Sequence, residues 1–590
     1  MGESTSAAGH TTEIQSLLEL DRVKIIGSVL SRSVRDLSDS RLRFVPRNVL
    51  VDAISKEIVR DFLQSCPELS RIQQLDLTTL ADNLAPPADG CHCGKPRCTG
   101  GRIIFVALLA ISRENLITSF LEPTQPAICD SDLSALSQEN ADSSYILPEA
   151  FQHLPTYELE RFIHFTWQMR SPFVQAFAQQ KSTIEDANTI LEFESNVSLP
   201  WTYLGEERDP MEEAVTRVQR VEIHSAHHDP TLLGGALGLK TFLERRQPRI
   251  SEENCKHEVL ANHRTRPHTR IVPLLAAFKH RGSFHLLLPW AHGGNLGDLF
   301  RKYATSPQTA RDDQQIAAWY SEDWLLGECE GLADGLAAVH EINNDAHHVL
   351  PSAQIHADIK PENILCFASG NGESDPFTLK LADFGEAQEV RASTRDVEAH
   401  RVAHTKTYRP PEHDTDDLLT LNYDVWCLGC VYLDFVTWAI GGMKLQEDFE
   451  EIRCNERDDA KVDTAEGKII RDTFFKKGSE HSIRQFRPGL KFGGKTAVRL
   501  DPKVSKTVTR ERHSMWVEHT GSRVKTVVKD GVTSVSFVSY PILAEKLQKL
   551  PPGYISRFHW IQNDSGRSKK PRDIHGSAFI YRVPTLPLTI

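Results

Sequence analysis

The sequence predicts an α+β protein in which a mainly helical N-terminal region precedes a small strand-rich region and then a second set of long helices. Three observations support this order. Apolar residues recur at three- and four-residue spacing from about Glu13 to Leu121, as in "IQSLLELDRVKIIGSVL", which indicates amphipathic helices. Short strand-like runs such as "VTRVQRVEI" and "FHLLLPW" follow residue 196. Long helical patterns return at 314–340 and 423–440.

These changes in the spacing of apolar residues divide the chain into segments. A stretch rich in Pro, Ser and Asp near 122–147 is typical of a linker inside the helical extension. The predicted segments are a disordered tail at 1–12, the helical extension at 13–195, the region of strands and helices at 196–440, a polar linker or degenerate helical segment at 441–485, and a basic segment at 486–590.

Composition bounds the class of protein. The 590 residues are 40% hydrophobic and 25% charged, which favours folded domains over a disordered or fibrous chain. Residues 481–590 carry 20 Lys and Arg against 7 Asp and Glu, a balance of +13, so residues 1–480 sum to −25 within the total of −12. A basic segment of this kind attracts nucleic acid, anionic lipid or the acidic body itself. No recognisable nucleic-acid motif accompanies it, so a solvated or self-docking segment is favoured.

The sequence favours an intracellular protein, cytoplasmic or nuclear. The N-terminus lacks the basic start and apolar core of a secretory signal. The longest apolar run, "IIFVALLAI" at 103–111, is half the length of a membrane span and is typical of a buried element. The 11 scattered cysteines are expected to be reduced thiols. No feature of the sequence indicates an oligomeric state.

A cluster of soft donors, "CHCGKPRC", contains Cys91, His92, Cys93 and Cys98. Zinc needs four such ligands in a tetrahedron. Adjacent Cys-His-Cys residues do not easily face one ion, and no second Cys/His pair follows at the usual spacing. A glycine-rich loop with incidental thiols is therefore the favoured interpretation, and a zinc site is the alternative.

The stretch "HADIKPEN", residues 356–363, places an aspartate, a lysine and an asparagine just before the apolar pair Ile364-Leu365. Phosphoryl transfer to a hydroxyl needs an acceptor for the proton of the nucleophile, oxygen ligands for Mg²⁺, and positive charge near the transferring group. Asp358 can accept the proton, Lys360 can approach the γ-phosphate, and Asn363 can supply an amide oxygen to the metal.

Other residues that suit phosphoryl transfer lie on both sides of this stretch in the sequence. Asp383 opens an Asp-Phe-Gly in "LKLADFGEAQ" and can complete the metal sphere. "TKTYRPPE" at 405–412 comes next, and then Asp424, which opens a buried helix. Upstream, Lys240 lies on the predicted strand "LGLKTFL", and Glu258 lies on a following helix.

Over roughly 196–440 the chain resembles the eukaryotic protein kinase family, and the Asp-x-Lys-x-x-Asn pattern resembles its Ser/Thr members. The resemblance implies a two-lobed domain with a small β-rich lobe and a helical lobe, using ATP and Mg²⁺ on a protein substrate with Ser or Thr acceptors. It also leaves open whether the helical lobe is complete after residue 440. "VEIHSAHHDP" and "LLLPWAHGGNL" are similar to kinases of filamentous fungi with a helical N-terminal extension.

The resemblance assigns roles residue by residue. Asp358 is implied as the catalytic base and Lys360 as its catalytic partner, with Asn363 and Asp383 as Mg²⁺ ligands. Thr405 is implied to bond to both the catalytic aspartate and the lysine. The implied nucleotide-binding residues are Lys240 paired to Glu258 at the phosphates, Leu288 as gatekeeper, Trp290 and Ala291 in the adenine hinge, and Gly205 in the phosphate loop.

Two departures from the family pattern affect function. Only Gly205 remains of the usual glycine-rich loop, and five acidic residues follow it within 206–213. We expect ATP to bind about one or two powers of ten more weakly, because a like-charge contact costs on the order of 1–3 kcal/mol. This departure leaves a pseudokinase-type interaction module as the alternative to an active kinase.

Ala357 stands where many family members have an arginine that binds a phosphorylated residue. We therefore expect that phosphorylation of Ser393 or Thr394 does not activate this protein. Drift at this position in an inactive relative is the alternative explanation.

Overall fold

The protein is described by a computed structural model, which separates into two compact units. Unit 1 comprises residues 1–183, 189–252 and 274–289, and unit 2 comprises 184–188, 253–273 and 290–590. The structure describes residues 18–35, 43–66, 74–87, 90–95, 97–120, 128–136, 154–174, 190–204, 216–228, 235–243, 248–304, 320–341, 353–370, 375–390, 396–402, 405, 407–410, 413, 418–455, 461–464, 467–470, 516–517, 524–529, 532–538, 559–560 and 578–584.

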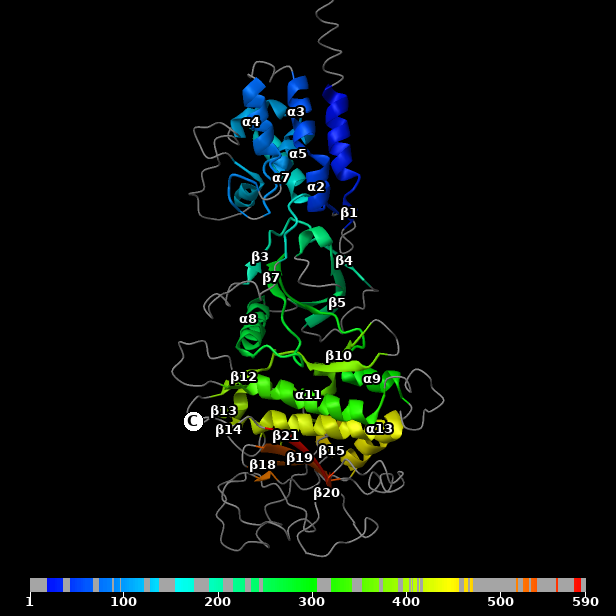
Figure 1. The fold of residues 1–590 in the computed structure, drawn as a ribbon. Coiled ribbons are helices and arrows are strands. Elements are labelled where there is room, and N and C mark those ends of the chain that lie inside the picture. The colour runs from blue at the N-terminus through cyan, green and yellow to red at the C-terminus, as the bar shows by residue number, and fades with distance from the viewer. Residues whose placement is uncertain are drawn as a thin grey trace, which may run out of the picture. The chain divides into compact units, whose positions relative to one another are not determined.

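The N-terminal part of unit 1 is mainly helical, as the apolar spacing predicts (Figure 1). Its core helix is α5, in which every residue from Arg102 to Leu109 is buried, so the apolar run at 103–111 forms a buried element. Helix α5 spans Arg102–Ala110. The other described elements of this part are residues 18–30, β1 (Val34–Arg35), β2 (Arg43–Phe44), α2 (Arg47–Ala53), α3 (Lys56–Ser65), α4 (Gln74–Leu84), η1 (Glu114–Phe120), η2 (Asp130–Leu136) and α7 (Thr156–Trp167).

Part of the predicted linker near 122–147 packs into this helical region instead. Residues 130–136 form the 3₁₀ helix η2, and Asp130 accepts hydrogen bonds from the backbone N–H groups of Ile103 and Ile104, each at 3.1 Å. A carboxylate at the N-terminus of α5 satisfies N–H groups that have no partner within the helix. The Pro, Ser and Asp residues that suggested a linker therefore include a helix cap.

The second half of unit 1 is a six-stranded sheet in the order β3-β7-β8-β6-β5-β4. All its neighbouring strands are antiparallel except β3 and β7. Buried Trp201, Leu239 and Phe278 contribute to its core. The elements are β3 (Leu191–Glu192), β4 (Trp201–Tyr203), β5 (Thr216–Ile223), η5 (Ser225–His227), β6 (Leu237–Phe242), β7 (Ala276–His280) and β8 (Ser283–Pro289).

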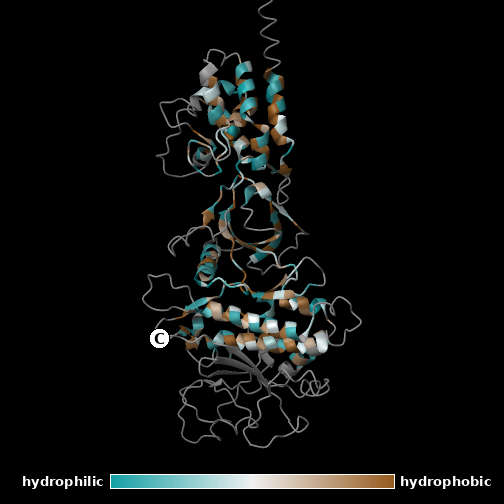
Figure 2. Cartoon of the chain, viewed as in Figure 1, coloured by the Kyte–Doolittle hydropathy of each residue, from teal (hydrophilic) through white to brown (hydrophobic). Residues whose placement is uncertain are grey.

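Unit 2 has a helical core with short two-stranded antiparallel sheets. The long helices α11 and α13 both carry apolar residues (Figure 2), and α13 is kinked at Gly442, whose φ of 65° favours glycine. The elements are α8 (Pro248–Arg264), part of which belongs to unit 1, α9 (Leu296–Lys302), α11 (Glu322–His340), β9 (Ala353–Ile355), η6 (Pro361–Asn363), β10 (Ile364–Ala368), β11 (Phe377–Leu381), β12 (Gln388–Val390), β13 (Asp396–Glu398), η7 (Ala399–Arg401), β14 (Leu418–Thr420) and α13 (Asn422–Asn455).

Further strands follow α13. A hairpin joins two of them, and the rest form a sheet in the order β17-β18-β19-β21-β20. Their bounds are β15 (Lys461–Thr464), β16 (Gly467–Ile470), β17 (Trp516–Val517), β18 (Val524–Lys529), β19 (Val532–Val538), β20 (His559–Trp560) and β21 (Ala578–Pro584). Because α13 continues to Asn455, it crosses the domain boundary predicted after residue 440, and that boundary stays a prediction.

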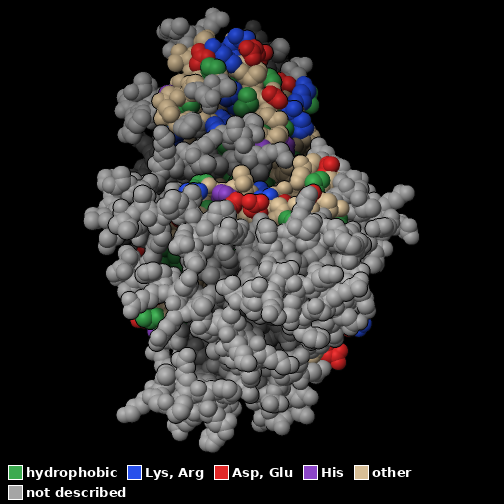
Figure 3. Space-filling model, turned by 60° about the horizontal axis from the view of Figure 1, so that its bottom comes forward, with side chains coloured by type: hydrophobic (Ala, Val, Ile, Leu, Met, Phe, Trp, Pro, Cys, Tyr) green, Lys and Arg blue, Asp and Glu red, His purple; other side chains and the backbone are tan. Residues whose placement is uncertain are grey.

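The fold class is α+β, as predicted. Within the described residues, no helix combines the length and apolar character needed to cross a bilayer. On the face shown in Figure 3, described side chains of both charge signs are interspersed.

Candidate active site

The segment 356–363 forms a turn-rich loop between β9 and β10 in unit 2. Its last residues form the 3₁₀ turn η6, in which the Asn363 N–H donates to the Lys360 carbonyl at 3.0 Å. Proline at the first position of this turn suits its fixed φ and missing N–H. The loop therefore presents three polar side chains within a short span of backbone.

The Asp358 carboxylate is the centre of this loop. Its Oδ1 accepts a hydrogen bond from Thr405 Oγ1 at 2.6 Å, and its Oδ2 accepts from Lys360 Nζ at 2.6 Å and from Asn363 Nδ2 at 2.8 Å. Lys360 Nζ also lies 3.2 Å from Thr405 Oγ1. Thr405 thus donates to Asp358 and accepts from Lys360, and contacts with both residues are what the family resemblance implies. Three hydrogen bonds hold the carboxylate in one orientation, and the Lys360 ammonium compensates its negative charge.

A second aspartate holds the backbone of the loop. Asp424, in the first turn of α13, is fully buried and accepts from the N–H groups of His356 at 2.7 Å and Ala357 at 2.9 Å. Its Oδ2 also lies 2.9 Å from His340 Nε2. Ala357 adopts a φ of 69°, which is uncommon for a residue with a side chain. The two N–H bonds stabilise this conformation directly before Asp358.

The pairing of β10 with β11 brings Asn363 and Asp383 to the same end of one hairpin. Ile364 pairs with Leu381, and the Asn363 carbonyl accepts from the Ala382 N–H at 2.9 Å. Asp383 follows with a φ of 65°, and its Oδ1 accepts from the Gly385 N–H at 3.2 Å. The antiparallel register therefore explains why two residues far apart in sequence come together.

Phe384 anchors this turn in the core. Its side chain is 1% exposed, and its ring centroid lies 4.9 Å from that of His356. His356 Nε2 lies 3.1 Å from the Ala382 carbonyl. These contacts tie the segment carrying Asp383 to the loop carrying Asp358.

Several carboxylates lie near the turn that carries Asp383. The pKa of Glu386 is raised by partial loss of water around its carboxylate and then by repulsion from Asp358 and Asp383. Glu258 of α8 is buried, and a Cβ added to Gly385 would lie 3.6 Å from its Oε2 and 3.2 Å from Asp383 Oδ1. Several carboxylates thus surround the turn at 383–386, which is a donor set that suits Mg²⁺.

The side-chain amide of Asn363 is also held in one orientation. Its Nδ2 donates to both the carbonyl and the carboxylate of Asp358, each at 2.8 Å. A carboxylate only accepts, so the nitrogen must face Asp358 and the amide oxygen faces the other way. That oxygen is of the type that Mg²⁺ prefers.

The predicted nucleotide-binding residues are distributed over both units. Lys240 on β6 is buried and pairs in register with Leu286, and Leu288 on β8 pairs with Gly238. Trp290 and Ala291 directly follow β8, and Ala291 is buried. Gly205 and the acidic residues after it lie outside the described residues. The approach of Lys240 to Glu258 and to the loop at 358–363 stays a prediction.

Sequence reasoning did not find the structural role of several residues around this loop. Asp424 was recognised only as the start of a buried helix, and the contacts of His340, His356 and Glu386 were not predicted. The only signal for Asp424 was an acidic residue in the first turn of an apolar helix.

The loop and the hairpin together carry the residue types that phosphoryl transfer to a hydroxyl needs. Residues 234–463 match the family model described as "Protein kinase domain". This part of the chain is similar to the eukaryotic protein kinase superfamily.

Curated proteins that this chain matches at low identity are named as protein kinases. Mitogen-activated protein kinase kinase 1 of Arabidopsis thaliana is 27% identical over 28% of this chain and 38% of its own length. Serine/threonine-protein kinase PKH3 of Eremothecium gossypii is 28% identical over 31% and 22%. Receptor protein-tyrosine kinase CEPR1 of Arabidopsis thaliana is 30% identical over 36% and 19%. The chain spans less than two fifths of the length of these relatives.

Proposed function

We propose that this protein is an ATP- and Mg²⁺-dependent protein kinase that transfers the γ-phosphate to Ser or Thr hydroxyls of a protein substrate. The observation that carries the proposal is the set of hydrogen bonds on Asp358 from Lys360, Asn363 and Thr405. A carboxylate held in this way can orient a hydroxyl and accept its proton.

Each residue near Asp358 has a proposed role. Lys360 stands beside the acceptor and offsets charge on the transferring phosphoryl group, and its place in the Asp-x-Lys-x-x-Asn pattern favours Ser and Thr substrates. Asn363 and Asp383 supply oxygen ligands to Mg²⁺, which when bound neutralises negative charge on the phosphates. Lys240, paired to Glu258, contacts the α- and β-phosphates, and Leu288, Trp290 and Ala291 contact the adenine.

The second candidate function is an interaction module that transfers phosphate weakly or not at all. The observation that favours it is the acidic sequence after Gly205, because carboxylates repel a triphosphate. The residues around Asp358 favour the enzyme, because all of them keep the types that the chemistry needs.

Incubating the full chain with labelled ATP, Mg²⁺ and a generic basic protein tests the two candidates. We expect label transfer by the wild type and a decrease of roughly 10²–10⁴-fold in Asp358→Asn, which removes the proton acceptor. Asp334→Asn is the matched control, since this exposed carboxylate of α11 lies outside the site. Absence of label transfer by both the wild type and Asp358→Asn would support the interaction module. A thermal-shift titration with ATP and Mg²⁺ then reports whether nucleotide binds.

A second prediction concerns regulation. Ala357 is buried and its methyl group carries no charge, so it cannot bind a phosphate as an arginine would. Replacing Ser393 and Thr394 together by alanine should leave the rate of transfer within about twofold of the wild type. The measurement is the same labelled-ATP assay. Loss of transfer with an unchanged circular dichroism spectrum would contradict this prediction.

A further inference from the structure

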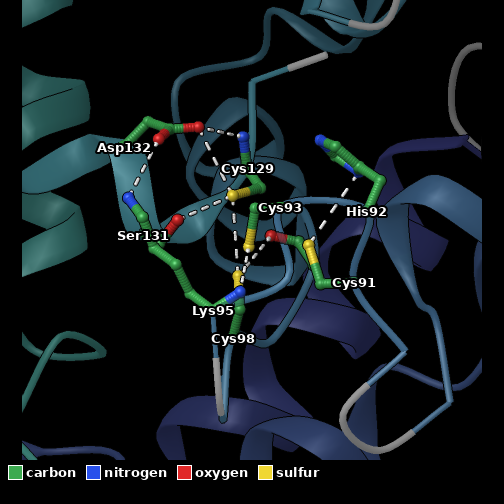
Figure 4. Close-up of polar contacts among 9 residues, drawn as sticks. Cys91, His92, Cys93, Lys95, Cys98, Cys129, Ser131 and Asp132 are labelled. Atoms are coloured by element: carbon green, nitrogen blue, oxygen red, sulfur yellow. Dashed lines mark hydrogen bonds and ion pairs between the residues drawn. The ribbon is translucent and has the colours of Figure 1, made fainter. Parts of the chain in front are cut away.

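Four cysteine thiols converge in the helical part of unit 1. Cys91, Cys93 and Cys98 belong to the loop between α4 and α5, and Cys129 directly precedes η2. Their four Sγ atoms all lie within 4.8 Å of one another, and Figure 4 shows the sulfur atoms gathered at one point. His92, which the sequence suggested as a donor, is not a member of this group.

The spacing of the sulfur atoms fits a tetrahedral metal. Zn–S bonds of about 2.3 Å place the sulfurs of a ZnS₄ tetrahedron about 3.8 Å apart. Cys98 Sγ and Cys129 Sγ are 3.6 Å apart, which is far longer than the ~2.05 Å of a disulfide. All four cysteines are free thiols. The group is therefore packed at the distance of shared coordination and not of covalent pairing.

The loop at 91–98 has a conformation that presents its sulfurs inward. The Gly94 N–H donates to the Cys91 carbonyl at 3.1 Å, and Gly94 has a φ of 65°. The Lys95 N–H donates to Cys93 Sγ at 3.4 Å. A backbone N–H aimed at sulfur stabilises the thiolate form that a metal requires. The tight turn explains how Cys91 and Cys93, separated by one residue, face the same point.

Cys129 is positioned by residues of η2, which directly follow it in the chain. It is fully buried, and its N–H donates to Asp132 Oδ2 at 2.9 Å. Its Sγ lies 2.8 Å from Ser131 Oγ and 3.3 Å from Asp132 Oδ2. The Asp132 carboxylate is also 3.5 Å from Lys95 Nζ, which offsets its charge beside the cluster.

We propose that Cys91, Cys93, Cys98 and Cys129 bind one zinc ion. Four protein ligands leave no position for substrate, so the site is structural. Thiolates select soft metals, and zinc is the common occupant of tetrahedral S₄ sites. Bound zinc joins the start of the segment 98–129 to its end, and α5, the buried core helix, lies within that segment.

The test uses the full chain, purified under reducing conditions without added metal. Elemental mass spectrometry should find about one zinc per chain. After chelation, Co²⁺ should restore binding with the sulfur-to-cobalt charge-transfer absorption of a thiolate site. A wild type that holds no metal, or a cobalt form without thiolate bands, would overturn the proposal. Iron in place of zinc would overturn the choice of metal.

Variants separate a metal site from incidental packing of thiols. Cys129→Ser should lower the zinc content by about tenfold or more, and Cys93→Ser, at a half-exposed position, should do the same if Cys129→Ser fails to fold. Two controls should keep the zinc of the wild type: His92→Gln, adjacent to the ligands, and Cys66→Ala, a buried cysteine outside the group. Full zinc content in both ligand variants would contradict the assignment.

Discussion

Replacing Asp383 by asparagine should lower the rate of phosphoryl transfer by roughly 10³-fold. The carboxylate lies in the turn that follows β11, beside the carboxylates of Glu258 and Glu386. Loss of a charged ligand weakens a bound Mg²⁺, and a decrease of about 4 kcal/mol in transition-state stabilisation corresponds to that factor. The measurement is the initial rate with labelled ATP over a range of Mg²⁺ concentrations.

The dependence of the transfer rate on Mg²⁺ concentration distinguishes loss of a metal ligand from misfolding of the variant. Raising the Mg²⁺ concentration should partly restore the rate of Asp383→Asn, because the amide keeps a weaker oxygen ligand. It should not restore Asp358→Asn, which retains the proposed metal ligands and lacks the proton acceptor. Asp334→Asn again serves as the matched control. A wild-type rate in Asp383→Asn at low Mg²⁺ would remove Asp383 from the proposed metal site.

Replacing Asp424 by alanine should destabilise unit 2 and abolish most of the activity, although Asp424 has no proposed contact with substrate. The change leaves the buried N–H groups of His356 and Ala357 without their acceptor. Each unsatisfied group costs about 1–3 kcal/mol, so we expect the free energy of unfolding to decrease by about 4 kcal/mol. Displacement of Asp358 by about 1 Å would lower the rate by about 10²-fold.

Hydrogen–deuterium exchange and the labelled-ATP assay measure the two effects. Exchange at 353–360 should accelerate in Asp424→Ala. Asp424→Asn keeps one carbonyl acceptor and should fall between alanine and the wild type in both measurements. Unchanged exchange at 353–360 in Asp424→Ala would show that this carboxylate does not hold the loop.

The grouping of polar side chains in the loop at 356–363 could be predicted from sequence because these residues are close together along the chain. Asp358, Lys360 and Asn363 occupy one short turn, so any fold that keeps the turn keeps them near one another. The antiparallel pairing of β10 and β11 then brings Asp383 to the same end. Local spacing and a single hairpin are enough to place most of the proposed chemistry.

Contacts between residues that are far apart in the sequence could not be predicted in the same way. Asp424 reaches the N–H of Ala357 across 67 positions, and Cys129 reaches Cys98 across 31. Neither residue carries a local pattern that names its partner. The segment around Cys129 resembled a linker because its polar residues cap α5 and turn the chain instead of forming an amphipathic helix.

The amino-acid order thus established the class of fold, the protein kinase resemblance and the residue types of the loop at 356–363, since periodicity and short motifs are properties of neighbouring residues. Packing alone revealed the buried aspartate that supports the loop and the fourth thiol of the cysteine group. Such partners are chosen by burial: a carboxylate or a thiol inside the protein needs donors or ligands, and the folded chain supplies them from segments that are remote in sequence.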